Sequence, residues 1–558
     1  MGVTDLQARL VDAGGAFASN ARNPQLRRAQ LSFLGAWTAE YAFTVALGIV
    51  AYREGGAAAV GLVGLLRMLP SALLAPLLTP LADRGRRERV LVLVSMLRGL
   101  ATAGAALAAA WQGPAVVVYT LAVLSTVAAT LFRPAHSALL PSLCRTGHEL
   151  ASANVVRGML DSVATLVGPL LAAVLLGLTD VSVVFTVAAV ASFASAAILV
   201  GLRYDAPPRP AAHQRPQLLA EAVQGLQVVS SSRDLTLVMV LAAAQALTKG
   251  ALTVLSVVVA IELLATGEPG AGALMTAVGV GAVVGSLFAS LLVGTARLCA
   301  WFALGIALWG LPLVVVGLVP QEALALVVLA FIGVGNALID VAAFTLLGRL
   351  APEEVLARVF GVLESTVAVF VGLGAVLASG IVEVWGPRAA LVCVGLVCPV
   401  LAAVALPRLR RLDHAVGVRD RAVTLLQQVP MLRVLPLPSI EQLARGLRPV
   451  AVPEGQEVFA QGEVGDVYFV IESGEAEVLG DGRIVTSLGP GEGFGEIALL
   501  RRSPRTATVR ARTELRLRAL DGEHFLPVVL GFTPAGREAT AGVDLLLDRW
   551  APGTDPLP

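Results

Sequence analysis

The sequence has few charged residues, few aromatic residues and a single lysine. Asp, Glu, Lys and Arg make up 15% of the 558 residues, and aromatic residues make up 5%. A soluble domain carries about a quarter of its residues as charges, so the composition excludes a soluble globular protein. Hydrophobic residues make up 56% instead, which predicts a membrane protein. Almost all of the positive charge is arginine, since Lys249 is the only lysine.

Cysteines are also scarce. The four of them, Cys144, Cys299, Cys393 and Cys398, form no Cys-x-x-Cys pair, which argues against a disulfide framework or a zinc site. No nucleophile–base motif, metal-ligand spacing or Walker phosphate loop is present either. We therefore expect no enzymatic activity, no bound metal and no cofactor. A net charge of +1 gives no reason to expect a nucleic-acid partner.

Long apolar runs fill residues 30–406. A membrane-spanning helix needs about 20 apolar residues, and twelve runs reach that length. They predict a helical bundle in a lipid bilayer, rich in the small residues that let helices pack closely. The twelve predicted spans are 30–52, 56–80, 90–111, 114–135, 151–177, 181–202, 235–262, 270–293, 297–318, 321–347, 355–383 and 387–406.

The arginines predict the direction in which the helices cross the membrane. Cytosolic loops carry an excess of Arg and Lys. The arginines gather before the first span, between the second and third, in the central loop and after the last. This pattern predicts a multi-pass protein of the plasma (inner) membrane with both termini in the cytosol. Segment 1–28 shows no sign of a signal peptide. The arginines are Arg22, Arg27, Arg28, Arg84, Arg86, Arg87, Arg89, Arg203, Arg209, Arg215, Arg408, Arg410 and Arg411.

Prolines and charges mark the domain boundaries. Pro207, Pro208, Pro210 and Pro216 break the apolar pattern after the sixth span and divide the bundle into two six-helix halves. In transporters of this architecture the substrate site lies near the midplane between the halves. The expected divisions are 1–28 (cytosolic segment), 29–203 (first half), 204–233 (central loop), 234–407 (second half), 408–438 (linker helix), 439–550 (C-terminal domain) and 551–558 (tail).

The second span ends in a distinctive charged loop, Asp83-Arg84-Gly85-Arg86-Arg87. The loop resembles the Asp-Arg-x-Gly-Arg-Arg loop of the major facilitator superfamily, with one residue fewer before Gly85. The resemblance implies that Asp83, Arg84, Arg86 and Arg87 latch the inner gate of a transporter through salt bridges.

Three further runs extend this resemblance over nearly all of residues 20–406. Gly168-Pro169 resembles a motif of proton-coupled exporters. Phe-Arg-Pro-Ala at 132–135 and Arg-Val-Phe-Gly at 358–361 resemble a bacterial exporter branch of the superfamily. The resemblance implies a proton-coupled exporter of a small molecule.

Several charged residues fall within the apolar spans. Burying a charge in lipid is costly unless it is paired or hydrated. One interpretation is a proton relay or a charged substrate site, and the other is a set of structural ion pairs or helix-end charges. Glu40 and Arg67 can pair within the first half. The candidates for transport and proton coupling are Glu40, Arg67, Lys249, Asp340 and Glu364, and Asp161 is a further intramembrane charge.

The pattern changes from helical to alternating in the C-terminal domain. Glycine turns recur at 473–474 and 481–482, and short strands separated by such turns predict a β-barrel or jelly roll. Helices are expected from Ser439 and over 522–529 and 534–550. The predicted strands are 448–452, 457–459, 467–472, 475–479, 484–488, 508–511 and 514–519. The predicted fold class is an all-α membrane bundle of twelve helices in two six-helix halves, plus a cytosolic β-jelly-roll domain with flanking helices.

The run 493–507 carries the most specific chemistry. The guanidinium of Arg505 suits a phosphate, and the carboxylate of Glu496 accepts a hydrogen bond from a hydroxyl. Together they describe a cyclic nucleotide. The run resembles the phosphate-binding cassette of cyclic-nucleotide-binding domains of the catabolite-activator and cyclic-nucleotide-dependent kinase type. The resemblance implies that Glu496 binds the ribose 2′-hydroxyl and Arg505 the cyclic phosphate. The other implied contacts are Gly495, Ile497, Ala498 and Thr506.

The sequence leaves two alternatives for the ligand and two for the function. Cyclic AMP is the preferred ligand, whereas Thr506 is a residue type that favours cyclic GMP in the family. No helix-turn-helix follows the barrel, which argues against DNA binding, and a homodimer through the cytosolic domain is compatible with the family. The first functional hypothesis is an exporter of a small molecule, coupled to protons and regulated by the nucleotide. The alternative is a membrane-anchored nucleotide receptor or scaffold that no longer transports.

Overall fold

The computed structural model describes residues 22–84, 86–144, 147–202, 218–292, 297–351, 355–433, 435–501 and 503–531. The chain divides into two compact units, Met1–Arg410 and Arg411–Pro558. The predicted helix at 534–550 lies outside the described residues.

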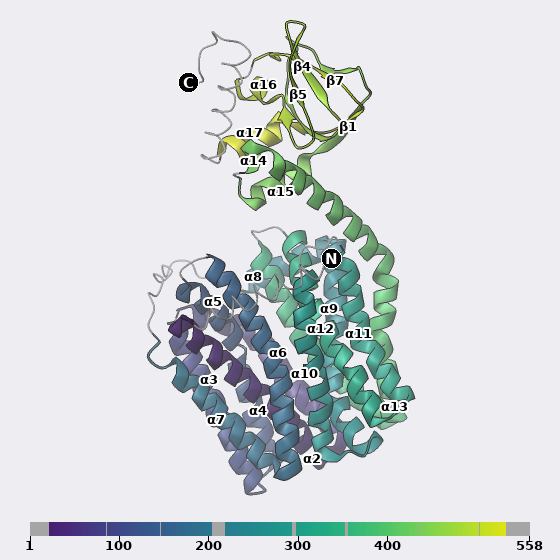
Figure 1. Cartoon of the computed structure of the whole chain (residues 1–558). Helices are drawn as coiled ribbons and strands as arrows, with labels where there is room; N and C mark the ends of the chain where they lie inside the picture. The colour runs from purple at the N-terminus through teal and green to yellow at the C-terminus, as the bar shows by residue number, and fades with distance from the viewer. Residues whose placement is uncertain are drawn as a thin grey trace. The chain divides into compact units, whose positions relative to one another are not determined.

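The first unit is a bundle of long helices that run side by side (Figure 1). Ten helices in the described part of the chain are long and apolar enough to cross a membrane. The predicted helical membrane bundle is thereby confirmed. The elements are α2 (Pro24–Arg84), α3 (Arg87–Ala110), α4 (Ala115–Ala129), α5 (Phe132–Leu143), α6 (Gly147–Leu178), α7 (Val181–Leu199), α8 (Leu218–Ser231), α9 (Arg233–Val258), the π-helix η1 (Val259–Leu263), α10 (Gly267–Leu292), α11 (Leu298–Leu318), α12 (Glu322–Leu350) and α13 (Leu356–Gln428).

Two of these helices contain a break at glycine. In α2 the helical geometry is lost at Gly55 and Gly56, and Gly56 has a φ of 59°. In α13 it is lost at Gly386, which has a φ of 83° and is followed by Pro387. A positive φ is strained for residues with a side chain, so glycine at these positions lets the chain leave one helical stretch and begin another.

The outer surface of the bundle is apolar, and its helix contacts are made by glycines. Large apolar side chains such as Leu73 are 65% exposed, which suits contact with lipid tails. A Cβ on Gly281 of α10 would overlap the carbonyl oxygen of Ala330 on α12, and a Cβ on Gly333 would overlap that of Val278. Because glycine has only a hydrogen as its side chain, the backbones of α10 and α12 can approach closely at these positions. Close packing of this kind is expected in lipid, where the hydrophobic effect does not drive helices together.

The second unit is built on two four-stranded antiparallel sheets (Figure 1). The strand orders are β1-β8-β3-β6 and β2-β7-β4-β5, and an apolar cluster that includes Ile471, Val478 and Leu517 lies between them. The predicted β-domain is confirmed. The strands are β1 (Arg448–Val452), β2 (Glu457–Phe459), β3 (Val467–Ser473), β4 (Ala476–Gly480), β5 (Arg483–Leu488), β6 (Gly493–Phe494), β7 (Thr508–Ala511) and β8 (Leu515–Asp521).

Helices cover the outer face of the β3–β8 sheet. They are the end of α13, α14 (Pro430–Arg433), α15 (Leu437–Gly446) and α17 (Gly522–Gly531), while α16 (Glu496–Arg501) follows β6. Leu426 of α13 and Phe525 of α17 lie in one apolar cluster with Tyr468 of β3. The Tyr468 and Phe525 rings stack with centroids 4.6 Å apart.

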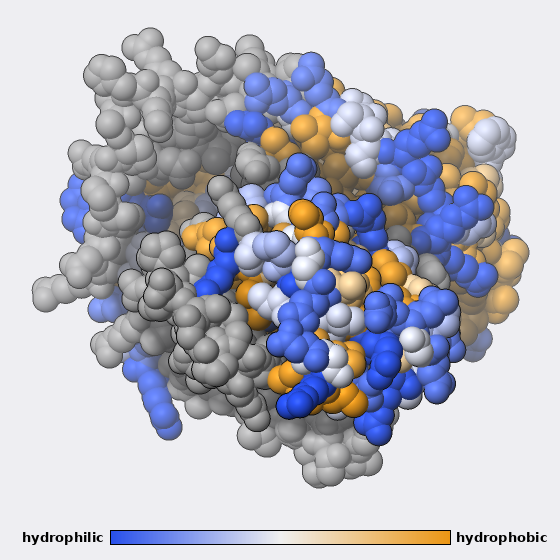
Figure 2. All heavy atoms as spheres, turned by 90° about the horizontal axis from the view of Figure 1, so that it is seen from above, coloured by the Kyte–Doolittle hydropathy of each residue, from blue (hydrophilic) through white to orange (hydrophobic). Residues whose placement is uncertain are grey.

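The face drawn in Figure 2 differs from the sides of the bundle. Hydrophilic residues predominate among its coloured atoms, with hydrophobic residues scattered between them. A surface of this kind suits contact with water, whereas the apolar sides of the bundle suit contact with lipid.

The contact between α10 and α12 gives a stability prediction. Gly281→Val must push α12 away because the new side chain would overlap the backbone at Ala330; we expect a loss of about 3 kcal/mol and a lower midpoint of thermal unfolding in detergent. The control is Gly380→Val, since a Cβ at Gly380 meets no atom within 4 Å. Equal midpoints for the two variants would contradict the close packing.

Candidate functional site

The predicted cassette forms a turn and a short helix at the edge of the second unit. Gly495 has a φ of 95°, a conformation that favours glycine, and it joins β6 directly to α16. Ile497 and Ala498 on α16 are buried, with exposures of 6% and 3%, and they anchor the helix in the domain. Thr506 is exposed.

Arg505 is held firmly although it carries a charge. The residue is 5% exposed. One terminal nitrogen donates to the carbonyl oxygen of Gly495 at 2.9 Å, and the other donates to that of Val467 at 2.7 Å. The guanidinium carbon lies 4.1 Å from the centroid of the Phe459 ring, a distance typical of a cation–π contact. Gly465 lies against the guanidinium, because a Cβ there would overlap Nε.

The loop before β3 is tied to the backbone around Arg505. The Gly462 amide donates to the Arg505 carbonyl at 2.8 Å, and the Arg505 amide donates to the Glu463 carbonyl at 2.7 Å. A bridge between Val464 and Pro504 continues this pairing. The fold therefore fixes the backbone that carries Arg505 as well as its side chain.

Glu496 is the unusual member of the site. Its Oε2 atom is buried without a hydrogen-bond partner in the part of the chain that the structure describes. Burial raises the pKa of the Glu496 carboxyl to about 7, against the opposing effects of its own backbone amide and of Arg505. Tyr468 is another buried group, and burial together with the Glu496 charge raises its pKa well above the usual value. A buried acceptor without a partner is costly, and a ligand hydroxyl would satisfy it.

The structure brings Gly495, Glu496 and Arg505 together, since Arg505 donates to Gly495 and interacts electrostatically with Glu496. A buried carboxylate oxygen and a fixed guanidinium suit a ligand with one hydroxyl and one phosphate. The sequence reasoning did not assign Phe459 or Val467. The contact between the Phe459 ring and the Arg505 guanidinium forms only when β2 is in place in the folded sheet. Val467 contacts Arg505 through its backbone carbonyl, which is independent of its residue type.

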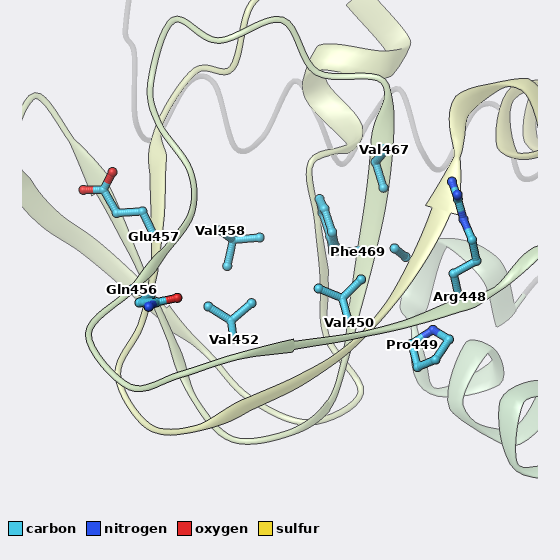
Figure 3. Close-up of a pocket in the computed structure, with 10 residues that line it drawn as sticks. Arg448, Pro449, Val450, Val452, Gln456, Glu457, Val458, Val467 and Phe469 are labelled. Carbon is cyan, nitrogen blue, oxygen red and sulfur yellow. The ribbon is translucent and has the colours of Figure 1, made fainter.

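A cavity of about 490 Å³ opens between β1 and β2 (Figure 3). Val450, Val452 and Val458 point into it. Its lining includes Val467 and Phe469 of β3 but neither Glu496 nor Arg505. The chemistry of the site therefore lies beside this cavity and not in its wall.

In the first unit, Glu40 is held between two arginines. Its Oε1 accepts from Arg67 at 2.7 Å and its Oε2 from Arg98 at 2.8 Å. Arg67 also donates to Thr126 at 2.9 Å, and Arg98 to the Ala36 carbonyl at 3.0 Å. The expected pairing of Glu40 with Arg67 is present. Arg98 was missed because its span continues past it without a break in hydropathy.

The remaining intramembrane candidates lie on helices of the second half. Lys249 is on α9, Asp340 on α12 and Glu364 on α13, and all three are exposed. Asn336 donates to Asp340 at 3.0 Å. Within the described ranges the side chains of Lys249 and Glu364 make no hydrogen bond or ion pair, although the Lys249 carbonyl accepts from Thr253.

The predicted gating loop is described only in part. Asp83 and Arg84 end α2, and the structure describes their backbone only. Arg86 pairs with Glu88 at 2.5 Å. Arg87 donates to the Ala138 carbonyl at 2.5 Å and so ties the start of α3 to α5.

Fold and site define a membrane protein with a C-terminal domain of the nucleotide-binding class. Residues 449–530 match the family model described as cyclic nucleotide-binding domain. Residues 31–263 and 238–448 match that of the Major Facilitator Superfamily. These ranges cover more than half of the chain, which therefore belongs to the major facilitator superfamily, here fused to a cyclic-nucleotide-binding domain.

Relatives match each part separately. A cAMP-dependent protein kinase regulatory subunit of Schizosaccharomyces pombe is 33% identical over 182 residues, 32% of this chain and 43% of that protein. An uncharacterized protein of Mycobacterium tuberculosis is 46% identical over 109 residues, 20% of this chain and 21% of that protein. The chain thus spans less than half the length of these relatives. A POT family transporter solved with 5-aminolevulinic acid shares the bundle fold, with a TM-score of 0.56, 14% identity, and coverage of 68% of this chain and 96% of that chain.

The raised pKa of Glu496 predicts that nucleotide affinity depends on pH. A ligand hydroxyl makes a stronger hydrogen bond to the ionised carboxylate of Glu496 than to the protonated acid. With a free-state pKa of about 7, the ionised fraction and hence the affinity should fall about tenfold between pH 8 and pH 6. The measurement is a calorimetric titration of the full-length protein in detergent with cyclic AMP. Glu496→Gln should bind more weakly and without this pH dependence; a wild-type affinity that is flat from pH 6 to pH 8 would contradict the role.

The contact with Phe459 predicts a second effect on affinity. Phe459→Leu keeps an apolar side chain but removes the ring face, so cyclic AMP should bind about fivefold more weakly. Phe459→Tyr keeps the ring face and should bind as the wild type does. Adenosine has no phosphate, and its affinity should be the same for all three proteins. Equal loss of adenosine binding in Phe459→Leu would show that the ring supports the barrel rather than Arg505.

Proposed function

We propose that this protein is a secondary active transporter, a proton-coupled exporter of a small molecule, regulated by a cyclic nucleotide bound to its C-terminal domain. Two observations support the regulatory part. Two backbone carbonyls fix the Arg505 guanidinium, and the buried Oε2 of Glu496 has no hydrogen-bond partner among the described residues. Membership of the major facilitator superfamily supports the transport part.

The membrane arrangement belongs to the same proposal. The breaks of α2 at Gly55–Gly56 and of α13 at Gly386 support the proposal that two of the ten candidate helices cross twice, which gives twelve spans. An even number of spans, with arginines on the inner side, gives cytosolic termini in the inner membrane. We place the two halves at 29–203 and 234–407 and the nucleotide domain at 439–550.

Cyclic AMP is the proposed ligand. The relative from Schizosaccharomyces pombe is named for dependence on cAMP. Cyclic GMP is the alternative, because Thr506 is exposed and adjoins Arg505 in the sequence, where its hydroxyl could meet a purine substituent.

For transport we propose different roles for the two groups of intramembrane charges. Both carboxylate oxygens of Glu40 accept from guanidinium groups, so Glu40, Arg67 and Arg98 hold the first half together. Asp340 and Glu364 are exposed and are therefore better placed to exchange protons. Lys249 supplies a positive charge that interacts with Asp340. Asp83, Arg84, Arg86 and Arg87 form the inner gate.

A physical route for regulation exists within the second unit. Tyr468 interacts electrostatically with Glu496 and packs with Leu426 and Val429 at the end of α13. A nucleotide that changes the charge or position of Glu496 thus acts on the residues that seat this helix end. Regulation requires that the nucleotide bind two transporter states unequally. A homodimer through the same helices would amplify the effect.

The alternative is a membrane-anchored nucleotide receptor that no longer transports. The observation that favours it is the full pairing of Glu40, since an ion pair of this kind can serve structure alone. Directional movement of any solute that depends on the protein excludes it.

The proposed function predicts coupled losses in one variant. Proteoliposomes that carry the protein are given a pH gradient and an isotope-labelled pool of cell metabolites, and the lumen is analysed by mass spectrometry. Cyclic AMP should change the accumulation of at least one solute severalfold. Arg505→Ala removes the phosphate contact and should abolish the response while basal accumulation persists.

The matched control is Arg512→Ala, which removes an exposed arginine paired with Glu475 on the same barrel and should leave the response intact. Accumulation without any response to cyclic AMP or cyclic GMP would refute regulation. Nucleotide binding without accumulation of any solute would favour the receptor.

A further inference from the structure

A set of charged side chains from both halves meets inside the bundle. In the first half, Arg133 of α5 pairs with Asp161 of α6 at 3.1 Å. The Arg133 guanidinium also lies 4.2 Å from the centroid of the Trp37 ring on α2. Arg157, one turn before Asp161 on α6, donates to the Ser137 hydroxyl and interacts electrostatically with both partners.

This face of the first half carries one surplus positive charge. Arg133 and Arg157 supply two positive charges, and Asp161 supplies one negative charge. Arg133 and Asp161 neutralise each other, so Arg157 is left without a carboxylate partner in the described ranges. Tyr41 adds a neutral hydroxyl within electrostatic range of Arg133 and Asp161.

The facing side of the second half carries the opposite surplus. Lys249 supplies one positive charge, and Asp340 and Glu364 supply two negative charges. Asp340 interacts with Lys249 and Glu364 on its own half. Its hydrogen bond from Asn336 brings no charge, so one negative charge remains.

The two surpluses face each other. Asp340 interacts electrostatically with Arg133 and Asp161 across the boundary between the halves. The backbones meet nearby, because a Cβ on Gly279 of α10 would lie 2.6 Å from the carbonyl oxygen of Thr165, one turn after Asp161. Exposed charges that sense the other half lie at the interface between the halves and not against lipid.

We infer that this interface is the substrate site and that it selects a small zwitterion. The anionic end of the substrate meets Arg133 and Arg157, and its cationic end meets Asp340 and Glu364. A zwitterion neutralises both surpluses and adds no net charge to a poorly solvated site, whereas a simple cation or anion leaves one end unpaired. The Trp37 indole Nε1, buried without a partner among the described residues, is a further donor beside Arg133. The inference rests on the proposed transport function.

The test uses the full-length protein in detergent and matched triads of compounds. Each of the common amino acids with an uncharged side chain is offered as the zwitterion, as its methyl ester (a cation) and as its N-acetyl derivative (an anion), and thermal unfolding reports binding. At least one zwitterion should raise the unfolding midpoint more than its own ester and acetyl forms. Because binding is read directly, a negative result here leaves transport and nucleotide regulation to be judged by their own experiments.

Two variants should change the selectivity in opposite directions. Arg157→Gln removes the positive surplus, so the zwitterion should bind about tenfold more weakly and its methyl ester should gain relative to it. Glu364→Gln removes the negative surplus, and the N-acetyl form should gain instead. Arg53→Gln breaks an exposed ion pair with Glu268 and serves as the control. Its order of preference among the zwitterion, the ester and the acetyl form should be the same as that of the wild type.

Three outcomes would overturn the assignment. The first is stabilisation of the wild type by esters alone or by acetyl derivatives alone. The second is no stabilisation by any zwitterion in the set. The third is an order of preference that both charge variants leave unchanged, which would mean that these charges only attract the two halves to each other.

Discussion

A charge removed from water must find a partner, and this constraint organises both units of the protein. In the membrane bundle Glu40 is held by Arg67 and Arg98, whose donors occupy both carboxylate oxygens. In the β-domain two carbonyls and an aromatic ring hold Arg505. Breaking such a pair is costly because it leaves one buried charge uncompensated. The positions of α2, α3, β2 and β3 relative to their neighbours are therefore fixed by electrostatics as well as by packing.

Incomplete pairing then marks the places where a ligand can act. Glu496 has a buried oxygen without a partner in the described part of the chain, and its carboxyl has a pKa of about 7. Two backbone carbonyls already restrict the Arg505 side chain, so little side-chain entropy remains to be lost when a ligand binds. In the bundle the corresponding feature is the opposed charge surplus at Arg157 and Glu364. In both units the proposed ligand site is therefore a place where charges or polar atoms are incompletely paired.

The arrangement of the β-domain also explains how a small ligand could affect a long helix. The ring of Tyr468 is buried between the cassette and the helices that pack on the sheet. Its neighbours on one side include Glu496 and on the other Phe525 and Leu426. Packed cores respond to a change at one side chain by shifting between discrete arrangements rather than deforming smoothly.

Much of the fold was predictable because its signals are local. Apolar runs of spanning length predicted the bundle, and alternation between glycine turns predicted strands such as 448–452 and 508–511, which the structure has at the same residues. The strand Gly493–Phe494 was missed because two residues show no alternation. Glu496 and Arg505 were predicted from residue type and spacing. Phe459 could not be, since its contact with Arg505 depends on how β2 lies against the loop before β7.

The sequence by itself determined the class of the protein, through the hydropathy of its spans, the placement of its arginines and the residues of one cassette. These signals can be recognised without the folded structure because each is contained in a short stretch of chain. Only the tertiary structure decided which charges are partners and which are left over. Arg98 joins Glu40, and Arg133 joins Asp161. Pairing is a property of distances between helices far apart in sequence, and no local pattern encodes those distances.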